Sequence, residues 1–524
     1  MDDKWTKITH CLLEKNHIRI PIQKRFFLYF VEDDETNIQK EKIIDVITSS
    51  GFLKDDPRLS VFRQRLKTLV KSKQINYEEF SYCIDNHISI LKKIFQKDII
   101  IPDFKGFCEK IKDIYEQTKI KEGGSVADYI PQLKQQDPTK YGISICTIDG
   151  QRFNIGDTKY KYSIQSCCKT INYGIALEEH NPEYVHTFVG REPSGQSFNE
   201  ITLNKEGKPH NPLINAGAIM TTSLIQKEKT HSERYDHIMN VWKDLSGGIG
   251  EVGFNNSVFL SEKNTADRNF AIAYFMKETN STKTIGFPEN TNLHQTLDLY
   301  FQCCSIELNT ETMAIVAGTL ANGGINPLTG KRIFQEETVK QMLSMMLMCG
   351  MYDYSGEFAF KIGIPAKSGV AGAIMLVIPN VMGIVTFSPR LDEIGNSYKG
   401  IEFCKLLGQT FNFHIFDSFQ SETKINPLVS RYQNNTINKQ TELYEACKHN
   451  DLEYVKILFQ RGVDFNVTDY DKRTPLHVAV CETHIELVKY LLQVVKVNKH
   501  IQDRWGHTPK DEANNNQKLL ELFQ

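Results

Sequence analysis

The spacing of hydrophobic and polar residues divides the chain into stretches of different character. Up to about residue 122, apolar residues recur at helical spacing, as in the stripe of Ile43, Val46 and Ile47, which predicts amphipathic helices. From about 123 to 420, glycines become frequent and short apolar runs at 142–148, 373–378 and 381–387 are separated by helical stretches. This mixture predicts an α+β fold in which helices cover an antiparallel sheet.

The longest apolar run, 371–387, is interrupted by Pro379 and Asn380. It is therefore expected to form two buried strands joined by a turn rather than a membrane span. The polar segment that follows has little to bury and predicts a linker. We expect a helical N-terminal domain at 1–122, an α+β domain at 123–420, a linker at 421–438 and a repeat domain at 439–524.

The repeat domain is indicated by a sequence pattern with a period of 33 to 34 residues. The segment 473–479 reads RTPLHVA, which matches the T-P-L-H-x-A start of an ankyrin unit, and related segments begin at Thr441 and Thr508. In this pattern, Thr caps a helix whose first residue is proline. Three such units bury their apolar faces against one another and predict either a partner-binding surface or a module packed on its own chain.

Composition narrows the classes of function. The 62 Lys and Arg residues and 64 Asp and Glu residues give a net charge of −2, so the basic excess typical of nucleic-acid binding is missing. The 12 cysteines are dispersed without a C-x-x-C pair, which favours a reduced compartment and neither a zinc site nor a disulfide framework. The acidic residues 32–35 lack the spacing of a calcium loop, so no metal or cofactor is expected.

The first residues lack both the apolar core of a secretory signal and the Arg- and Ser-rich character of a mitochondrial presequence. We therefore expect a cytoplasmic protein, with a mitochondrial location as the alternative. Neither nucleic acid nor a membrane is expected as a partner.

The strongest chemical signal is the pair Ser166 and Lys169 at S-x-x-K spacing, followed by an apolar helical stretch. On a helix, this spacing brings both side chains to one face. A buried lysine amine loses proton affinity and can act as the general base for the serine hydroxyl. The spacing alone is weakly specific, because the chain repeats it at Ser89/Lys92 and Ser421/Lys424.

The segment 366–372, AKSGVAG, makes a catalytic role for the S-x-x-K pair more specific. A K-[ST]-G strand beside an S-x-x-K helix is the arrangement of penicillin-recognising serine enzymes. In it, the backbone N–H groups of Val370 and Ser166 could form an oxyanion hole. A tyrosine hydroxyl near the serine could move a proton, and the chemistry alone leaves Tyr352 and Tyr354 open.

These motifs, together with the segments 126–133, 209–218 and 261–269, resemble the kidney/liver-type glutaminases along most of the chain. The resemblance implies a β-lactamase/transpeptidase-like catalytic domain, preceded by a helical domain and followed by ankyrin repeats. It also implies hydrolysis of L-glutamine to L-glutamate and ammonia, and a homodimer or homotetramer.

The resemblance also implies roles for individual residues. Ser166 would be the nucleophile and Lys169 its base, while Tyr352 would assist proton transfer and Val370 would complete the oxyanion hole. Glu262 would pair with the α-ammonium, and Asn215, Asn269 and Tyr300 would hold the α-carboxylate. The substrate-binding set is completed by Tyr129 and Gln165.

A departure from the family lies in the segment 190–203, which aligns with a mobile loop that links phosphate activation to tetramer contacts in the relatives. Phe198 matches the family, whereas Glu200 replaces a lysine and Thr202 replaces an aromatic residue. An anion in place of a cation weakens local attraction for anions. We therefore expect phosphate activation to differ here, and the inhibitor pocket of the relatives to be lost.

Three other functions compete with glutamine hydrolysis. A β-lactamase or transpeptidase would share both motifs but would not need Glu262. A cysteine-dependent amidotransferase would use Cys167 or Cys168 with a histidine partner that the sequence does not identify. A catalytically inactive scaffold would act through the ankyrin units alone.

Overall fold

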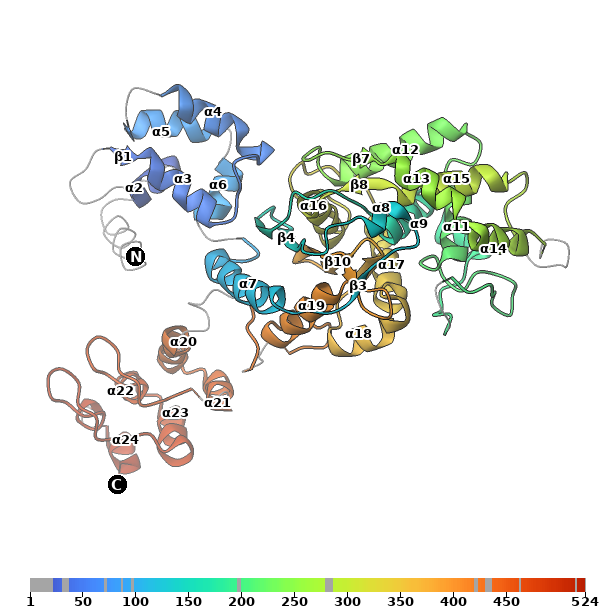
Figure 1. Ribbon diagram of the computed structural model, residues 1–524. Helices are drawn as coiled ribbons and strands as arrows, with labels where there is room; N and C mark the ends of the chain where they lie inside the picture. Colours follow the sequence, from blue (N-terminus) through green and yellow to red (C-terminus); the bar gives the residue numbers. More distant parts are fainter. Residues whose placement is uncertain are drawn as a thin grey trace. The chain divides into compact units, whose positions relative to one another are not determined.

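The computed structural model describes residues 22–30, 37–69, 73–85, 88–95, 99–195, 199–278, 286–418, 423–428, 436–460, 463–513 and 516–523. The chain forms two compact units, Met1–Pro427 and Leu428–Gln524. Helices and strands of both units are labelled in Figure 1. Since the second unit begins at residue 428, the boundary between the units falls within the polar segment that the sequence analysis interprets as a linker.

The N-terminal region contains two helix–strand–helix arrangements. The first consists of α2 (Ile22–Phe30), β1 (Ile38–Gln39) and α3 (Lys40–Ser49), and the second of α4 (Ser60–Thr68), β2 (Gln74–Ile75) and α5 (Tyr77–Ile84). The two strands pair antiparallel, with Ile38 opposite Ile75, and both isoleucines are buried in a core that α6 (Ile88–Phe95) completes. The predicted helices are therefore present, but the short sheet that joins them was not predicted.

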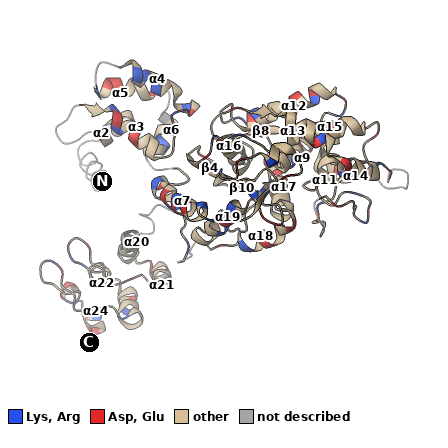
Figure 2. Ribbon diagram, viewed as in Figure 1, with Lys and Arg blue, Asp and Glu red and all other residues tan. Residues whose placement is uncertain are grey.

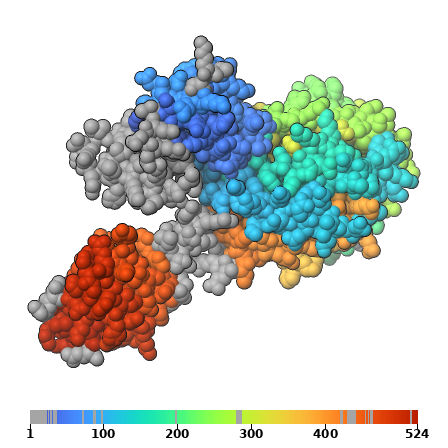
Figure 3. Space-filling model, turned by 60° about the vertical axis from the view of Figure 1, so that its left-hand side comes forward, coloured from blue at the N-terminus to red at the C-terminus, as the bar shows by residue number. Residues whose placement is uncertain are grey.

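Polar contacts attach this region to the rest of its unit. Arg152 forms an ion pair with Asp55, with an N–O distance of 2.6 Å. The amide of Gln151 donates to the Ser50 carbonyl at 3.0 Å. In the space-filling view of Figure 3, the blue N-terminal region and the cyan region beside it form a continuous surface.

The centre of the first unit is a five-stranded antiparallel sheet in the order β5-β4-β11-β10-β9. The predicted pair of strands is β10 (Ala373–Ile378) and β11 (Met382–Phe387), and Asn380 turns between them with a φ of 62°. The sequence analysis correctly interpreted this apolar run. The other strands are β4 (Gly142–Thr147), β5 (Arg152–Gly156) and β9 (Ala366–Gly369).

Helices cover both faces of this sheet (Figure 1). Helix α16 (Thr310–Ala321) crosses β11 at Gly383, where a Cβ atom would lie 2.4 Å from the backbone of Ala317. On the opposite face, α19 (Tyr398–Thr410) approaches β10 and β11 at Gly400 and packs beside α7 (Phe104–Lys119). Successive residues of these strands point to opposite faces of the sheet, so they pack alternately against the helices on the two faces. The predicted α+β architecture is confirmed.

The unit contains further helices, and three of its short strands form a second small sheet in the order β6-β8-β7. The elements are β3 (Ser125–Val126), α8 (Pro131–Lys134), β6 (Tyr162–Ser163), α9 (Cys168–Glu179), α10 (Pro182–Phe188), α11 (Asn215–Leu224), α12 (His231–Leu245), β7 (Gly253–Phe254), α13 (Asn256–Asn264), α14 (Asp267–Glu278), α15 (Leu293–Cys304), β8 (Ile306–Leu308), α17 (Glu336–Cys349), α18 (Ser355–Lys361) and β12 (Arg390–Leu391).

The second unit is helical, and its middle repeat begins as predicted. Thr474 caps α22 (Pro475–Cys481) by accepting a hydrogen bond from the His477 N–H, with Pro475 as the first helical residue. The first repeat departs from the prediction, because α20 (Thr436–Lys448) begins earlier and Thr441 lies inside it. The third is shortened to a 3₁₀ turn at Asp511–Ala513. The other helices are α21 (Leu452–Gln460), α23 (Ile485–Tyr490) with a π-helical turn at Leu491–Val495, and α24 (Gln517–Leu522).

Charged residues of both signs are interspersed along the visible helices and loops (Figure 2). This distribution agrees with the near-zero net charge of the chain. Among the described residues, no helix combines the length and the apolar composition that a membrane crossing requires.

Candidate active site

Ser166 and Lys169 lie where a 3₁₀ turn, Gln165–Cys167, runs into α9. The serine therefore occupies the turn, whereas the sequence analysis expected both residues on one regular helix. Gln165 has a φ of 48°, an uncommon conformation for a residue with a side chain and one that recurs at functional sites. Ser166 is 8% exposed and Lys169 is completely buried.

Strand β9 carries the K-S-G motif against this turn. A Cβ atom on Gly369 would lie 2.9 Å from the Ile164 carbonyl oxygen, so only glycine allows the strand to approach so closely. The Cys167 thiol donates to the Lys367 carbonyl at 3.5 Å. The two motifs, about 200 residues apart in the sequence, thus lie side by side.

A tyrosine completes this cluster. The Tyr352 hydroxyl donates to the Ser368 carbonyl at 3.2 Å and shares a hydrogen bond with Ser166. Tyr352 is buried and has a φ of 53°, whereas Tyr354 packs its ring against Phe358. Of the two tyrosines that the sequence left open, Tyr352 is the one beside the serine.

A cavity of about 360 Å³ opens above Ser166, a volume typical of small-molecule sites. Its walls combine polar side chains from several helices with a few apolar ones. The predicted residues that line it are Tyr129, Gln165, Ser166, Asn215, Glu262, Asn269, Tyr300 and Val370. The fold therefore brings together side chains from widely separated parts of the chain.

Asn215, the first residue of α11, joins one wall of the cavity to the buried lysine. Its side-chain oxygen accepts a hydrogen bond from Lys169 Nζ at 2.6 Å and another from the Tyr300 hydroxyl at 3.4 Å. Its amide nitrogen donates to Asn269 at 3.0 Å. These bonds fix the orientation of the asparagine amides and of the lysine amine.

Glu262 supplies the negative charge of the cavity. The Tyr129 hydroxyl donates to its carboxylate at 2.8 Å, and Gln165 forms a second hydrogen bond with it. Burial nevertheless raises the pKa of Glu262 above its usual value. A partly buried carboxylate is stabilised by a cation beside it, so this wall is suited to an ammonium group.

Two buried lysines determine the electrostatics below the cavity. Burial lowers the pKa of Lys169, which favours the neutral amine that a general base requires. Burial and the charge of Lys169 together lower the pKa of Lys367 to about 7. The Lys367 amine donates to the Ser368 carbonyl at 2.8 Å and lies 4.8 Å from the centre of the Tyr352 ring.

Neither cysteine next to the nucleophile is placed for catalysis. Cys167 and Cys168 are completely buried, and burial raises the pKa of both thiols. Among the described residues that line the cavity, there is no histidine that could activate a thiol. This geometry disfavours the cysteine-dependent alternative.

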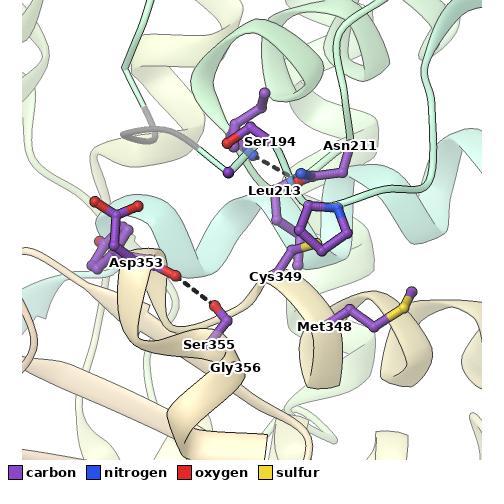
Figure 4. Close-up of a pocket in the computed structure, with 12 residues that line it drawn as sticks. Ser194, Asn211, Leu213, Met348, Cys349, Asp353, Ser355 and Gly356 are labelled. Atoms are coloured by element: carbon purple, nitrogen blue, oxygen red, sulfur yellow. Dashed lines mark hydrogen bonds between the residues drawn. The ribbon is translucent and has the colours of Figure 1, made fainter. Parts of the chain in front are cut away.

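A second cavity, of about 480 Å³, lies on another side of Tyr352. Figure 4 shows its walls: the loop at Ser194, the segment at Asn211 and Leu213, and the end of α17 at Met348 and Cys349. Ser355, which donates to the Tyr352 carbonyl at 2.6 Å, borders it as well. Tyr352 thus lines the second cavity, while its hydroxyl hydrogen-bonds Ser166, which lines the first.

The predicted regulatory residues are only partly placed. Phe198 lies outside the described residues, whereas Glu200 is exposed and Thr202 is half-buried. Asn199, Arg268 and Cys304, which are not among the predicted site residues, also line the first cavity. Arg268 donates to the Asn199 carbonyl at 3.5 Å, so this loop contacts the mouth of the cavity.

In the described part of the chain, no group of three or more His, Cys, Asp or Glu side chains is placed to hold a metal ion. The acidic residues 32–35, which the sequence analysis interpreted as a solvated helix start, lie outside the described residues.

The chain matches three known families. The glutaminase family matches residues 124–416, ankyrin repeats (three copies) match 414–503, and an EF-hand domain matches 22–102. The EF-hand match agrees with the two paired helix–strand–helix arrangements, which the sequence analysis interpreted only as helices. A twelve-residue calcium loop has glycine at its sixth position and glutamate at its twelfth. A loop that started at any of residues 32–35 would have neither. This EF-hand architecture therefore lacks the usual ligands there.

Two relatives are similar to this chain over most of its length. The mitochondrial liver isoform of glutaminase from Rattus norvegicus is 41% identical, covering 93% of this chain and 80% of its own length. Putative glutaminase 2 from Caenorhabditis elegans is 41% identical, with coverages of 90% and 79%.

Two solved structures are similar to 59% of this chain. A probable glutaminase, ybaS, is 36% identical with a TM-score of 0.55, and the match covers 59% of this chain and 98% of that one. The protein Mglu, solved in a form with tris and glutamate, is 32% identical with a TM-score of 0.55 and coverages of 59% and 67%.

Proposed function

Since the chain belongs to the glutaminase family, we propose that it hydrolyses L-glutamine to L-glutamate and ammonia through an acyl-enzyme on Ser166. The observation that carries this proposal is the position of Ser166 at a polar cavity, with the buried amine of Lys169 one turn away. The cavity has an acidic wall at Glu262 and an amide-rich wall at Asn215 and Asn269. These walls match the two charged groups of a free amino acid.

In the acylation step, neutral Lys169 takes the hydroxyl proton while Ser166 Oγ attacks the side-chain amide carbon. The backbone N–H groups of Ser166 and Val370 stabilise the oxyanion that forms. Tyr352 transfers a proton to the departing ammonia, which its hydrogen bond to Ser166 makes possible. The product of this step is a γ-glutamyl ester.

In the deacylation step, water takes the place of ammonia and attacks the ester carbon. Tyr352 and Lys169 accept and return the proton in the reverse order, as microscopic reversibility requires. Release of L-glutamate restores the hydrogen bond between Lys169 and Asn215 that the structure contains.

An ammonia-release assay with L-glutamine, L-asparagine and D-glutamine tests this proposal. Turnover of L-glutamine alone is expected, because the distance between the acidic wall and Ser166 selects the side-chain length and the α-carbon configuration. Turnover of a β-lactam without L-glutamine would favour a β-lactamase instead. An inactive full-length protein would favour the scaffold interpretation.

Replacing Glu262 with glutamine tests the ammonium site. Glutamine can still accept the hydrogen bond from Tyr129 but leaves the substrate ammonium without its charge partner. We expect KM to rise about a hundredfold, with a smaller change in kcat, since unpairing a buried charge costs about 2–5 kcal/mol. The comparison substrate is an analogue without the α-amine, for which E262Q and the wild type should differ little. An unchanged KM for L-glutamine would contradict this role.

The pH dependence follows from the buried amine of Lys169. Burial lowers the pKa of Lys169 below its ordinary value of 10.5. Neutral Lys169 is the active form, so kcat/KM should rise with pH as Lys169 loses its proton and should fall on acidification. A kcat/KM that does not fall on acidification would contradict Lys169 as the base.

We also propose that phosphate activates this enzyme less than its relatives. The exposed Glu200 places an anion where the family has a lysine, which repels phosphate near the loop. Glu200→Lys is expected to increase the stimulation of kcat/KM by phosphate, whereas Glu206→Lys, an exposed charge change on the same segment, should not. Equal stimulation of all three proteins would contradict the proposal.

Assembly and compartment belong to the same proposal. We infer a homodimer or homotetramer, a protein partner for the ankyrin repeats and a cytoplasmic location, and the named relatives include mitochondrial ones. Sedimentation of the purified chain tests the first inference, and imaging of the tagged full-length protein tests the last.

A further inference from the structure

Two buried thiols meet directly beneath the substrate cavity. The sulfur atoms of Cys168 and Cys304 are 3.8 Å apart although the residues are 136 positions apart in the sequence. Cys168 opens α9 and precedes Lys169, while Cys304 ends α15, the helix that carries Tyr300. The mechanism proposed above uses neither thiol.

We propose that Cys168 and Cys304 form an oxidant-sensitive thiol pair that closes to a disulfide and inactivates the enzyme. The chemical class of the modifying agent is a small hydroperoxide, such as hydrogen peroxide. The consequence for activity rests on the proposed role of Lys169, whereas the formation of the disulfide does not.

The two thiols differ in access, which assigns them different roles. Cys304 lines the substrate cavity and is 5% exposed, whereas Cys168 is completely buried. A peroxide small enough to enter the cavity therefore reaches Cys304 first. Burial raises the pKa of the Cys168 thiol, which leaves it unreactive until an oxidised sulfur lies next to it.

The reaction is balanced in two steps. Hydrogen peroxide transfers one oxygen to the Cys304 sulfur, which is oxidised to a sulfenic acid, while the O–O bond breaks and one water forms. The Cys168 sulfur then attacks the Cys304 sulfur, so the S–S bond forms and the S–O bond breaks. The hydroxide leaves with the thiol proton as a second water.

The disulfide would disturb catalysis because of where Cys168 lies. Bonded sulfurs are about 2.0 Å apart, so the two sulfur atoms must move toward each other, and the start of α9 and the end of α15 must follow as far as rotation of the side chains does not close the gap. Lys169 and Tyr300 both hydrogen-bond Asn215, and each is within four residues of one of the thiols. A displacement of about 1 Å at a catalytic group can lower the rate about a hundredfold.

The test is a peptide map of the full-length protein after treatment with hydrogen peroxide, with glutaminase activity measured on the same samples. We expect a disulfide that links the peptides of Cys168 and Cys304, a loss of activity of at least tenfold, and recovery of both with dithiothreitol. Each variant is compared with its own activity before treatment. L-Glutamate in the cavity should slow the oxidation, because it covers Cys304.

Neighbouring cysteines supply matched controls. Cys167 and Cys303 each directly precede one of the two proposed thiols in the sequence and lie on the same peptides. Cys167→Ala and Cys303→Ala should therefore retain the disulfide link. Cys168→Ala and Cys304→Ala should lose it. Oxidation of the exposed Cys481 shows that the oxidant has reached the protein. Oxidised Cys481 without a Cys168–Cys304 link would overturn the proposal, as would a complete link that leaves activity unchanged.

Discussion

Replacing Ser166 with alanine should abolish ammonia release from L-glutamine, with a loss in kcat of at least about a thousandfold. The alanine removes the only atom proposed to bond with the substrate and leaves the cavity walls unchanged. The variant should therefore still bind L-glutamine, which isothermal titration calorimetry can measure together with the lost turnover.

The chain contains its own control for this substitution. Ser89 has the same S-x-x-K spacing but is exposed on α6, so Ser89→Ala should leave turnover unchanged. Cys167→Ala, next to the nucleophile, should reduce activity by less than about tenfold. If S166A remained active while C167A did not, the nucleophile would be a thiol and the proposed chemistry would be wrong.

Replacing Lys169 with methionine should lower kcat about as much as the serine substitution. Methionine fills most of the volume of the lysine stem but cannot accept the Ser166 proton. Since the two side chains act as one unit, the double variant S166A/K169M should be no less active than either single variant. Steady-state kinetics of all three proteins provides this comparison.

A loss of activity in K169M through unfolding must be distinguished from a loss of the catalytic base. A completely buried amine stabilises the fold little, because burial disfavours its charged form, so the Tm of K169M should not fall sharply. Lys92→Met on α6 is the matched surface control and should keep full activity. Multiplicative losses in the double variant would contradict a serine–lysine unit.

The sequence predicted those parts of the site that depend on local patterns. The strands β10 and β11 follow from an apolar run interrupted at Asn380, and the serine–lysine pair follows from its spacing. The K-S-G segment could be assigned to the same site because its order after the S-x-x-K motif matches a known arrangement. The cap at Thr474 follows from the ankyrin pattern in the same way.

Features that depend on distant contacts could not be predicted. Nothing in the spacing of Cys168 and Cys304 indicates that their sulfurs meet, because that distance depends on how α9 and α15 pack. The positive φ angles of Gln165 and Tyr352 are likewise imposed by the surrounding fold rather than by the residue type. The EF-hand match at 22–102 could not be predicted either, because the short strands and amphipathic helices of that region resemble any helical region in sequence.

The central claim is that glutamine hydrolysis passes through an ester on Ser166, and rapid-quench mass spectrometry tests it most directly. Enzyme mixed with L-glutamine and quenched within one turnover should carry one γ-glutamyl group on the peptide that contains Ser166, and S166A should carry none. A γ-glutamyl group on Cys167 or Cys168, or turnover by S166A at the wild-type rate, would contradict the account.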